Sequence, residues 1–312
     1  MPAQDVIIQS AFSLGGTLTL PHDGDHKFPA VLFIHGSGPI DRNSDAKGMP
    51  INAFKQFAEH FARLGFATLR YDKRGVGTSG GSFVETGMYD LVDDAVAAVQ
   101  FLKNQPRIDP ERIYVLGHSE GAILAPQVFE REPFKGMILL SGVAESLKLT
   151  VDRQNEMVFD ELGKMTGFKG FLIRLLGVAK KARKDSAKSF SKMMNSTTDT
   201  IRLKGIKVNA KWFREHYNYD VSASLPNVTC PTLVITGAKD IQVPPDHAEQ
   251  IASLVTGPSE WHVIPDLIHI LRKVDNVPTI LGLKGDYGKA VKLPIDPELT
   301  SLVSNWLQAQ EQ

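Results

Sequence analysis

The sequence predicts an α/β fold with a mostly parallel central sheet, flanking helices and one helical insertion. Short continuous apolar runs alternate along the chain with segments of helical periodicity, which is the pattern of strand-helix-strand crossover units. Unbroken apolar runs are typical of strands that are buried on both faces of a parallel sheet. Between positions 142 and 225 the strand pattern stops, and dense helical segments replace it.

The elements follow in order from these patterns. Two β-like runs, 5–10 and 16–20, surround a Leu-Gly-Gly turn and predict an opening antiparallel hairpin. Apolar runs predict buried strands at 31–34, 66–71, 113–117, 136–140, 232–236 and 261–264. Apolar residues at helical spacing predict helices at 51–64, 91–102, 122–129, 246–254 and 297–307. A Pro/Gly-rich insertion at 277–294 separates the last strand from the closing helix.

Composition favours one large domain and excludes some classes of site. The chain has 312 residues, of which 42% are hydrophobic and 22% are charged, an ordinary globular composition. Lys plus Arg and Asp plus Glu both number 35, so net charge directs the protein neither to nucleic acid nor to a membrane surface. Cys230 is the single cysteine, which excludes an intramolecular disulfide and a multi-cysteine metal site.

The predicted domain organisation is a core formed by 1–142 and 226–312 and a helical insertion formed by 143–225. The first residues lack a basic stretch followed by an apolar stretch, and nowhere do eighteen apolar residues run together. We therefore expect a cytoplasmic protein without an integral membrane segment. A homo-oligomer is compatible with this sequence.

The segment 117–121 reads Gly-His-Ser-Glu-Gly and fits G-x-S-x-G between a predicted strand and a predicted helix. In that context the motif holds a serine nucleophile on a strained turn beyond the end of the strand. The glycines let the strand and the helix approach each other closely. A Gly/Ser turn without chemistry is the alternative, but the strand, the motif and the helix in register favour Ser119 as a nucleophile.

A serine nucleophile needs a histidine base and an acid that orients the imidazole. In parallel sheets such residues lie just beyond the carboxyl ends of the strands. Asp240 follows the strand 232–236, and His269 follows the strand 261–264, so the order is Ser, Asp, His. Asp266, three residues before His269, is the alternative acid.

Two backbone N–H groups are needed to stabilise the oxyanion. We expect one from Glu120, which follows the nucleophile, and the other from Ser37 within His-Gly-Ser-Gly, with Gly38 as the second choice. Gly75 and Gly77 begin a literal G-x-G-x-x-G, but no helix opens at its last glycine, so we reject a dinucleotide site. No metal and no organic cofactor is implied.

Five ordered motifs together resemble the α/β-hydrolases, specifically serine esterases of the bacterial type and the serine-aminopeptidase-like branch. They are His-Gly-Ser-Gly-Pro at 35–39, Tyr-Asp-Lys-Arg-Gly-Val-Gly at 71–77, the segment 117–121, Gly-Ala-Lys-Asp at 237–240, and His269. The resemblance spans 28–142 and 231–312, and it implies the fold, the triad and a cap between the strands. It does not specify the substrate.

The insertion carries a dense set of apolar and methionine side chains, which either line an acyl pocket or fasten the cap to the core. Phe168, Phe171 and Trp212, with Gly38, are the candidates for contact with substrate. Lysines and arginines, such as Lys164 and those at 180–192, give the insertion a positive balance. A solvated face explains most of this charge, and binding of acidic groups, of acyl-CoA-like anions or of a membrane surface is the alternative.

The sequence therefore predicts a serine hydrolase that cleaves carboxylic esters with short to medium acyl or aryl groups. Its triad is Ser119, His269 and Asp240, and its partner is a small-molecule ester. A peptidase or an acyl-CoA thioesterase is the near alternative, because all three reactions share an acyl-enzyme. A non-catalytic sensor or scaffold is the distant alternative.

Overall fold

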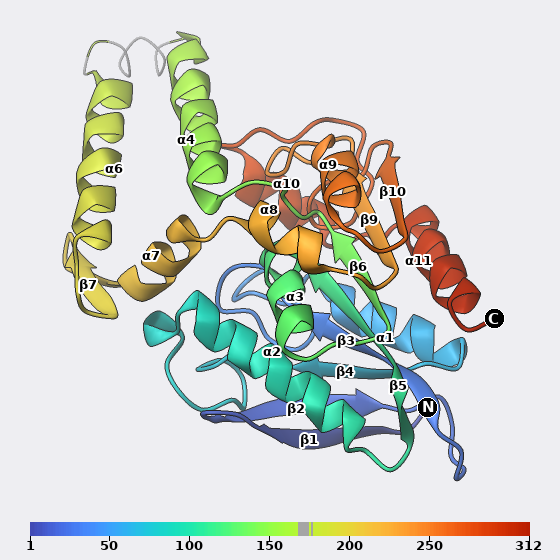
Figure 1. Ribbon diagram of the computed structural model, residues 1–312. Coiled ribbons are helices and arrows are strands. Elements are labelled where there is room, and N and C mark those ends of the chain that lie inside the picture. The colour runs from blue at the N-terminus through green and yellow to red at the C-terminus, as the bar shows by residue number, and fades with distance from the viewer. Residues whose placement is uncertain (168–174, 176) are drawn as a thin grey trace.

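The computed structural model describes residues 1–167, 175 and 177–312, and its centre is an eight-stranded sheet with helices on both faces (Figure 1). The strands are β1 (Ala3–Gln9), β2 (Ser13–Thr19), β3 (Phe28–Ile34), β4 (Ala67–Tyr71), β5 (Ile108–His118), β6 (Gly136–Leu140), β9 (Thr232–Gly237) and β10 (Ser259–Ile264). The covering helices are α1 (Ala53–Arg63), α2 (Met88–Lys103), α3 (Glu120–Arg131), α9 (His247–Leu254) and α11 (Pro297–Ala309). The predicted fold class is confirmed.

The strand order across the sheet is β1-β2-β4-β3-β5-β6-β9-β10. The pairs β1-β2 and β2-β4 are antiparallel, so the opening hairpin adds two strands at one edge. Its turn lies at 10–12, and the Leu-Gly-Gly predicted to form the turn instead lies within β2. Every other neighbouring pair in the sheet is parallel. The carboxyl ends of β3, β5, β9 and β10 consequently lie at the same edge, and that edge receives the residues that follow them.

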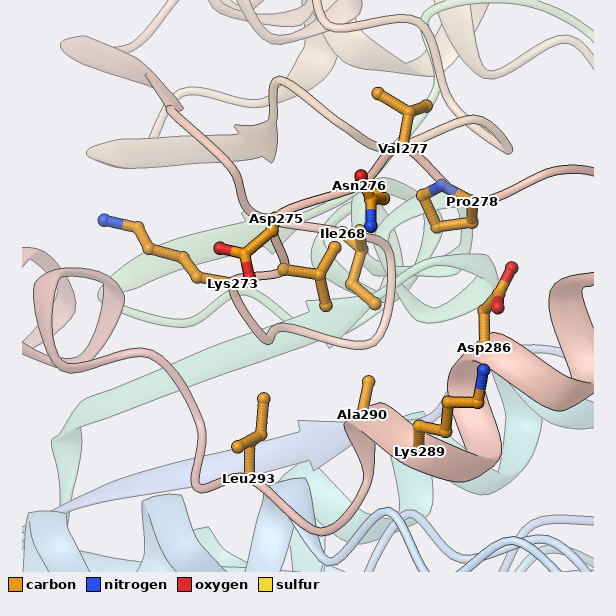
Figure 2. A pocket seen from close by; sticks show the side chains of 11 residues that line it. Ile268, Lys273, Asp275, Asn276, Val277, Pro278, Asp286, Lys289, Ala290 and Leu293 are labelled. Atoms are coloured by element: carbon orange, nitrogen blue, oxygen red, sulfur yellow. The ribbon is translucent and has the colours of Figure 1, made fainter.

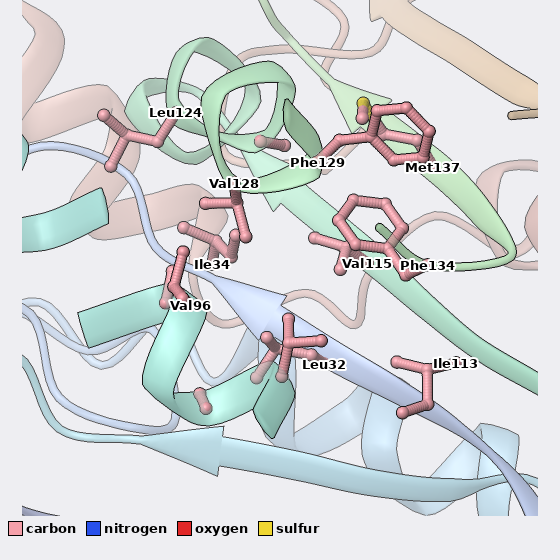
Figure 3. Close-up of a cluster of buried hydrophobic side chains, with 14 of the residues drawn as sticks. Leu32, Ile34, Val96, Ile113, Val115, Leu124, Val128, Phe129, Phe134 and Met137 are labelled. Carbon is pink, nitrogen blue, oxygen red and sulfur yellow. The ribbon is translucent and has the colours of Figure 1, made fainter. Parts of the chain in front are cut away.

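Alternation along the strands separates the core into two layers. On β3, Leu32 and Ile34 belong to the layer under α2, α3 and α9, whereas Val31 and Phe33 face α1 and α11. Figure 3 shows the first layer, in which Val115 of β5 lies among side chains from α2 and α3. Because both faces of the inner strands are buried, runs such as 31–34 on β3 contain no polar residue.

Residues between β6 and β9 leave the sheet and form α4 (Leu147–Lys164), α6 (Val178–Met194), α7 (Ala210–Asn218), α8 (Val221–Ser224) and the short 3-10 helix η2 (Leu225–Asn227). Figure 1 shows α4 and α6 projecting from the body of the molecule, with α7 between them and the core. The segment also contains an antiparallel hairpin, β7 (Thr200–Leu203) and β8 (Ile206–Asn209). The sequence pattern did not predict this hairpin, because four-residue strands carry too little alternation to be recognised.

The Pro/Gly-rich region 277–294 holds an element that the sequence pattern did not predict. It contains a helix, α10 (Leu283–Ala290), which buries Tyr287 and Ala290 against the core. Two internal glycines, Gly285 and Gly288, weaken the helical signal there. A short 3-10 helix, η1 (Phe83–Glu85), precedes α2.

Within the described part of the chain, no helix is both long and apolar enough to cross a membrane.

Candidate active site

Ser119 occupies the tight turn between β5 and α3. Its backbone has φ 56° and ψ −114°, a strained conformation for a residue with a side chain. A Cβ at Gly117 would lie 2.4 Å from the carbonyl oxygen of Gly121, and a Cβ at Gly121 would lie 2.1 Å from that of Ile34. Both glycines are therefore required by close approach of the backbone, as the motif predicts.

His269 lies in the loop after β10, and its Nε2 is 2.9 Å from Ser119 Oγ. Nε2 of the neighbouring His118 donates to the His269 carbonyl oxygen over 2.9 Å. Burial, together with the nearby His269, lowers the pKa of His118 to about 3, so His118 is neutral at pH 7. A neutral, buried imidazole thus fixes the backbone of the loop that carries His269.

Asp240 follows β9, and its Oδ2 lies 2.8 Å from His269 Nδ1. Its other oxygen, Oδ1, accepts hydrogen bonds from the backbone N–H of Gln242 at 2.9 Å and of Val243 at 3.0 Å. The carboxylate has no exposed side-chain surface. These contacts fix the tautomer of His269, because Nδ1–H donates to the carboxylate and leaves Nε2 free to accept the Ser119 proton.

Asp266, the alternative acid, has a different partner. Its side chain is 56% exposed, and its Oδ1 lies 2.6 Å from Nζ of Lys239. The hydrogen bond to Lys239, followed by the positive charge of that residue, lowers the pKa of Asp266. The structure therefore brings Asp240, rather than Asp266, to His269.

The loop after β3 lies against the serine. A Cβ at Gly36 would lie 3.3 Å from Ser119 Cβ, so a larger residue at position 36 would press on Ser119. Ser37 and Glu120 both line the cavity that contains Ser119. Gly38 has φ 100° and is not among the described residues that line that cavity.

A buried charge cluster that the sequence analysis missed lies beneath this site. Nζ of Lys73 is 2.6 Å from Glu120 Oε2 and donates to the Gly36 carbonyl oxygen over 2.6 Å. The indole Nε1 of Trp212 donates to Glu120 Oε1 over 2.5 Å, and His216 Nε2 lies 3.0 Å from the same oxygen. Lys73 was visible in the motif at 71–77, but nothing in the sequence indicated its partner.

The cavity above Ser119 has a volume of about 260 Å³. Its walls come from the core and from α4 and α7, including Leu147, Val151, Trp212 and Phe213. Trp212 thus lies where the sequence analysis expected contact with substrate. Phe168 and Phe171 lie outside the described residues.

A larger cavity, of about 500 Å³, lies beside the loop after β10 and away from Ser119. Figure 2 shows its wall, with Lys273, Asp286, Lys289 and Ile268 around the opening. Among residues 1–167, 175 and 177–312, no group of three or more His, Cys, Asp or Glu side chains could hold a metal ion.

Known proteins with similar sequences include a hydrolase family and a named esterase. A family model described as "Serine aminopeptidase, S33" matches residues 47–273. Esterase EstD of Thermotoga maritima is 29% identical over 237 residues, which cover 74% of this chain and 50% of that protein. The chain spans about half the length of the first curated relatives it matches.

Solved structures share the fold. An esterase of Thermogutta terrifontis is similar with a TM-score of 0.56 and 21% identity, covering 99% of this chain and 100% of that one. Est1E of Butyrivibrio proteoclasticus is similar with a TM-score of 0.59 and 17% identity, covering 98% of both chains. At these identities the likeness concerns the fold alone.

Proposed function

Because the chain belongs to the serine aminopeptidase S33 family of α/β-hydrolases, we propose that it is a serine hydrolase of carboxylic esters. In this proposal Ser119 is the nucleophile, His269 the general base and acid, and Asp240 the residue that orients His269. The backbone N–H groups of Glu120 and Ser37 receive the oxyanion. A relative named as an esterase supports the choice of ester as substrate.

The proposed reaction begins when Ser119 Oγ attacks the ester carbonyl and His269 Nε2 takes the hydroxyl proton. The tetrahedral intermediate collapses, the C–O bond to the alcohol breaks, and His269 returns the proton to the leaving alkoxide. The acyl group stays on Ser119 as an ester. Water then attacks this acyl-enzyme with His269 again as base, which releases the acid and restores the serine.

One observation carries the proposal. A continuous chain of contacts runs from Ser119 Oγ through His269 to Asp240, with distances of 2.9 and 2.8 Å. Residues 150 and 29 positions apart in the sequence meet there. Such contacts are the requirement for activating a serine hydroxyl, which is a weak nucleophile at its ordinary pKa.

The lining of the cavity favours esters over aminopeptidase substrates. An aminopeptidase has to hold a protonated α-amine, and a carboxylate in the cavity is a suitable partner for it. Glu120 is the one acidic residue among the described residues that line the cavity. Its side chain is 1% exposed and already binds Lys73 and Trp212.

The size and location of the cavity support short to medium acyl or aryl groups. A volume of about 260 Å³ is slightly below the usual range for drug-sized ligands. We further propose that 143–225 acts as a cap on the core 1–142 and 226–312. In support, α4 and α7 supply Leu147, Val151 and Trp212 to the wall of the cavity.

A substrate panel tests the proposal. We expect p-nitrophenyl esters from acetate to octanoate to be hydrolysed with a kcat/KM that greatly exceeds those for aminoacyl anilides and acyl-CoA thioesters. Ser119→Ala removes the nucleophile and should abolish the activity. A higher kcat/KM for the aminoacyl anilides would assign the site to the peptidase alternative, and a higher value for the thioesters to the thioesterase alternative.

A further inference from the structure

The side chain of Glu120 joins two parts of the protein that are far apart in the sequence. Its Oε2 contacts Lys73, from the loop after β4, and its Oε1 contacts Trp212 and His216, from α7. The side chains of Lys73, Glu120 and His216 are 3%, 1% and 1% exposed. The cluster is therefore shielded from water, and its contacts are stronger than the same contacts at a surface.

Lys73 extends the cluster to the loop that carries Ser37. Besides Glu120, its ammonium group donates to the carbonyl oxygen of Gly36. This carbonyl and the N–H of Ser37 belong to one peptide unit, which is planar. Lys73 therefore fixes the direction in which the Ser37 N–H points. The backbone N–H of Glu120 is the other proposed oxyanion donor. The buried ion pair between Lys73 and Glu120 therefore holds both proposed donors in place.

Several contacts fix helix α7, and with it Trp212 and His216, relative to the core. The Asn209 side chain caps its first turn by accepting from Trp212 N, and it donates to the carbonyl oxygens of Phe83 and Thr86. Lys211 Nζ lies 2.7 Å from Asp90 Oδ2 on α2. The ring of His216 packs on Trp212, with centroids 4.2 Å apart.

The charges also explain why the cluster acts as a unit. Burial raises the pKa of Glu120, but the positive charge of Lys73 and the close approach of the His216 ring outweigh it, so the pKa lies well below its usual range. Glu120 is therefore a carboxylate at pH 7. Removing one partner of a buried ion pair leaves an uncompensated charge, and the remaining groups must move to find another partner.

We propose that Glu120 is a positioning residue whose buried carboxylate couples helix α7, through Trp212, to the two backbone amides that receive the oxyanion. The coupling rests on the proposed function, because it presupposes an oxyanion at Ser119. Trp212 also lines the cavity, so a substrate that contacts its ring acts on the same hydrogen bond. An ester whose acyl group reaches Trp212 should therefore differ in kcat, as well as in KM, from an ester whose acyl group does not.

Glu120→Gln and Trp212→Phe test the coupling. The first keeps the shape of the side chain and removes its charge, and the second keeps an aromatic ring and removes the N–H donor. The matched control is Asp94→Asn. Asp94 is also a buried carboxylate paired with a cation of the motif at 71–77, since its Oδ2 lies 2.7 Å from Arg74 Nε, but it lies on α2 and is not among the residues that line the cavity.

The readouts are kcat and KM for p-nitrophenyl acetate, normalised to the number of sites that a fluorophosphonate labels at completion. Binding of a trifluoromethyl ketone, whose hydrate anion imitates the tetrahedral intermediate, is measured in parallel. We expect Glu120→Gln to lower kcat by roughly 10- to 100-fold, below the limit of about 10²–10³ for losing one donor entirely. Trp212→Phe should cause a smaller loss. In both variants the affinity for the ketone should fall in proportion to kcat, whereas KM should change little. In Asp94→Asn, kcat, KM and ketone affinity should all stay close to their wild-type values.

Different failures have different meanings. Should both Glu120→Gln and Trp212→Phe keep the wild-type kcat and ketone affinity, the coupling is wrong while the ester hydrolase stands. Should Asp94→Asn lose kcat equally, the effect is loss of packing rather than coupling. If Glu120→Gln fails to fold, Trp212→Phe still decides. A wild-type protein without Ser119-dependent hydrolysis would contradict the proposed function and the coupling with it.

Discussion

Replacing Asp240 with Asn should nearly abolish hydrolysis, and the structure indicates why. Oδ1 of Asp240 accepts from two backbone N–H groups, at Gln242 and Val243, and Oδ2 faces Nδ1 of His269. In Asp240→Asn the amide oxygen must remain on the two N–H donors, so the amide NH₂ group faces His269. The imidazole can then meet it only as an acceptor at Nδ1, which places the proton on Nε2.

This tautomer cannot take the proton of Ser119, whose Oγ lies 2.9 Å from Nε2. The corresponding change in a serine protease lowers kcat by about 10⁴, which corresponds to a barrier higher by about 5.5 kcal/mol. We expect a loss of this order in kcat for p-nitrophenyl acetate. The fold should persist, because the replacement keeps the volume and the two N–H contacts.

Asp266→Asn is the matched control, since it removes an identical charge three residues from His269. The Asp266 side chain, which pairs with Lys239, is 56% exposed, and exposed ion pairs contribute about 0–1 kcal/mol to stability. Its kcat should stay within a fewfold of wild type. Activity of Asp240→Asn within tenfold of wild type, or an equal loss in Asp266→Asn, would refute this reasoning about the tautomer.

Three further predictions concern helix α7, the sensitivity of the fold to acid and the turn at Ser119. Phe213→Ala removes a ring from the wall of the Ser119 cavity, so kcat/KM ratios between octanoate and acetate esters should change by about tenfold or more. An unchanged ratio, with a lower melting temperature, would assign Phe213 to packing. His118 has its pKa lowered to about 3 by burial, so the unfolded state binds more protons below pH 6.5. His118 should contribute stability that is complete above pH 6.5 and lost by about 1.4 kcal/mol per pH unit as pH falls towards 3, so His118→Asn should reduce the slope of urea-unfolding stability against pH by about this amount. Gly121→Ala places a Cβ 2.1 Å from the Ile34 carbonyl oxygen, and unfolding should become easier by at least about 1–3 kcal/mol. A melting temperature equal to wild type would contradict the close approach.

The sheet was predictable from the sequence because its inner strands are buried on both faces. Each crossover strand is a short apolar run between helical segments, and β3 illustrates how such a run supplies both layers, with Leu32 on one face and Phe33 on the other. The hairpin β7-β8 and the helix α10 were not predictable in the same way. Their short, polar or glycine-containing sequences carry little periodicity, and tertiary contacts decide their structure.

The candidate site residues were predictable where the end of a strand determines the place of the residue that follows it. Ser119, Asp240 and His269 all follow strands, and the parallel sheet brings those ends to one edge. The cluster of Lys73, Glu120 and His216 followed no such rule. Glu120 reads as an ordinary first-turn helix residue, and its partner His216 lies on α7, whose position depends on packing between the insertion and the core.

Intact-mass measurement after reaction with a fluorophosphonate tests the central claim most directly, because that reagent reports an activated serine without any assumption about the substrate. The account predicts one covalent adduct on the wild-type protein, none on Ser119→Ala, and greatly slowed labelling of His269→Ala. Labelling that persists at the same rate in Ser119→Ala would show that the nucleophile lies elsewhere and would contradict the account.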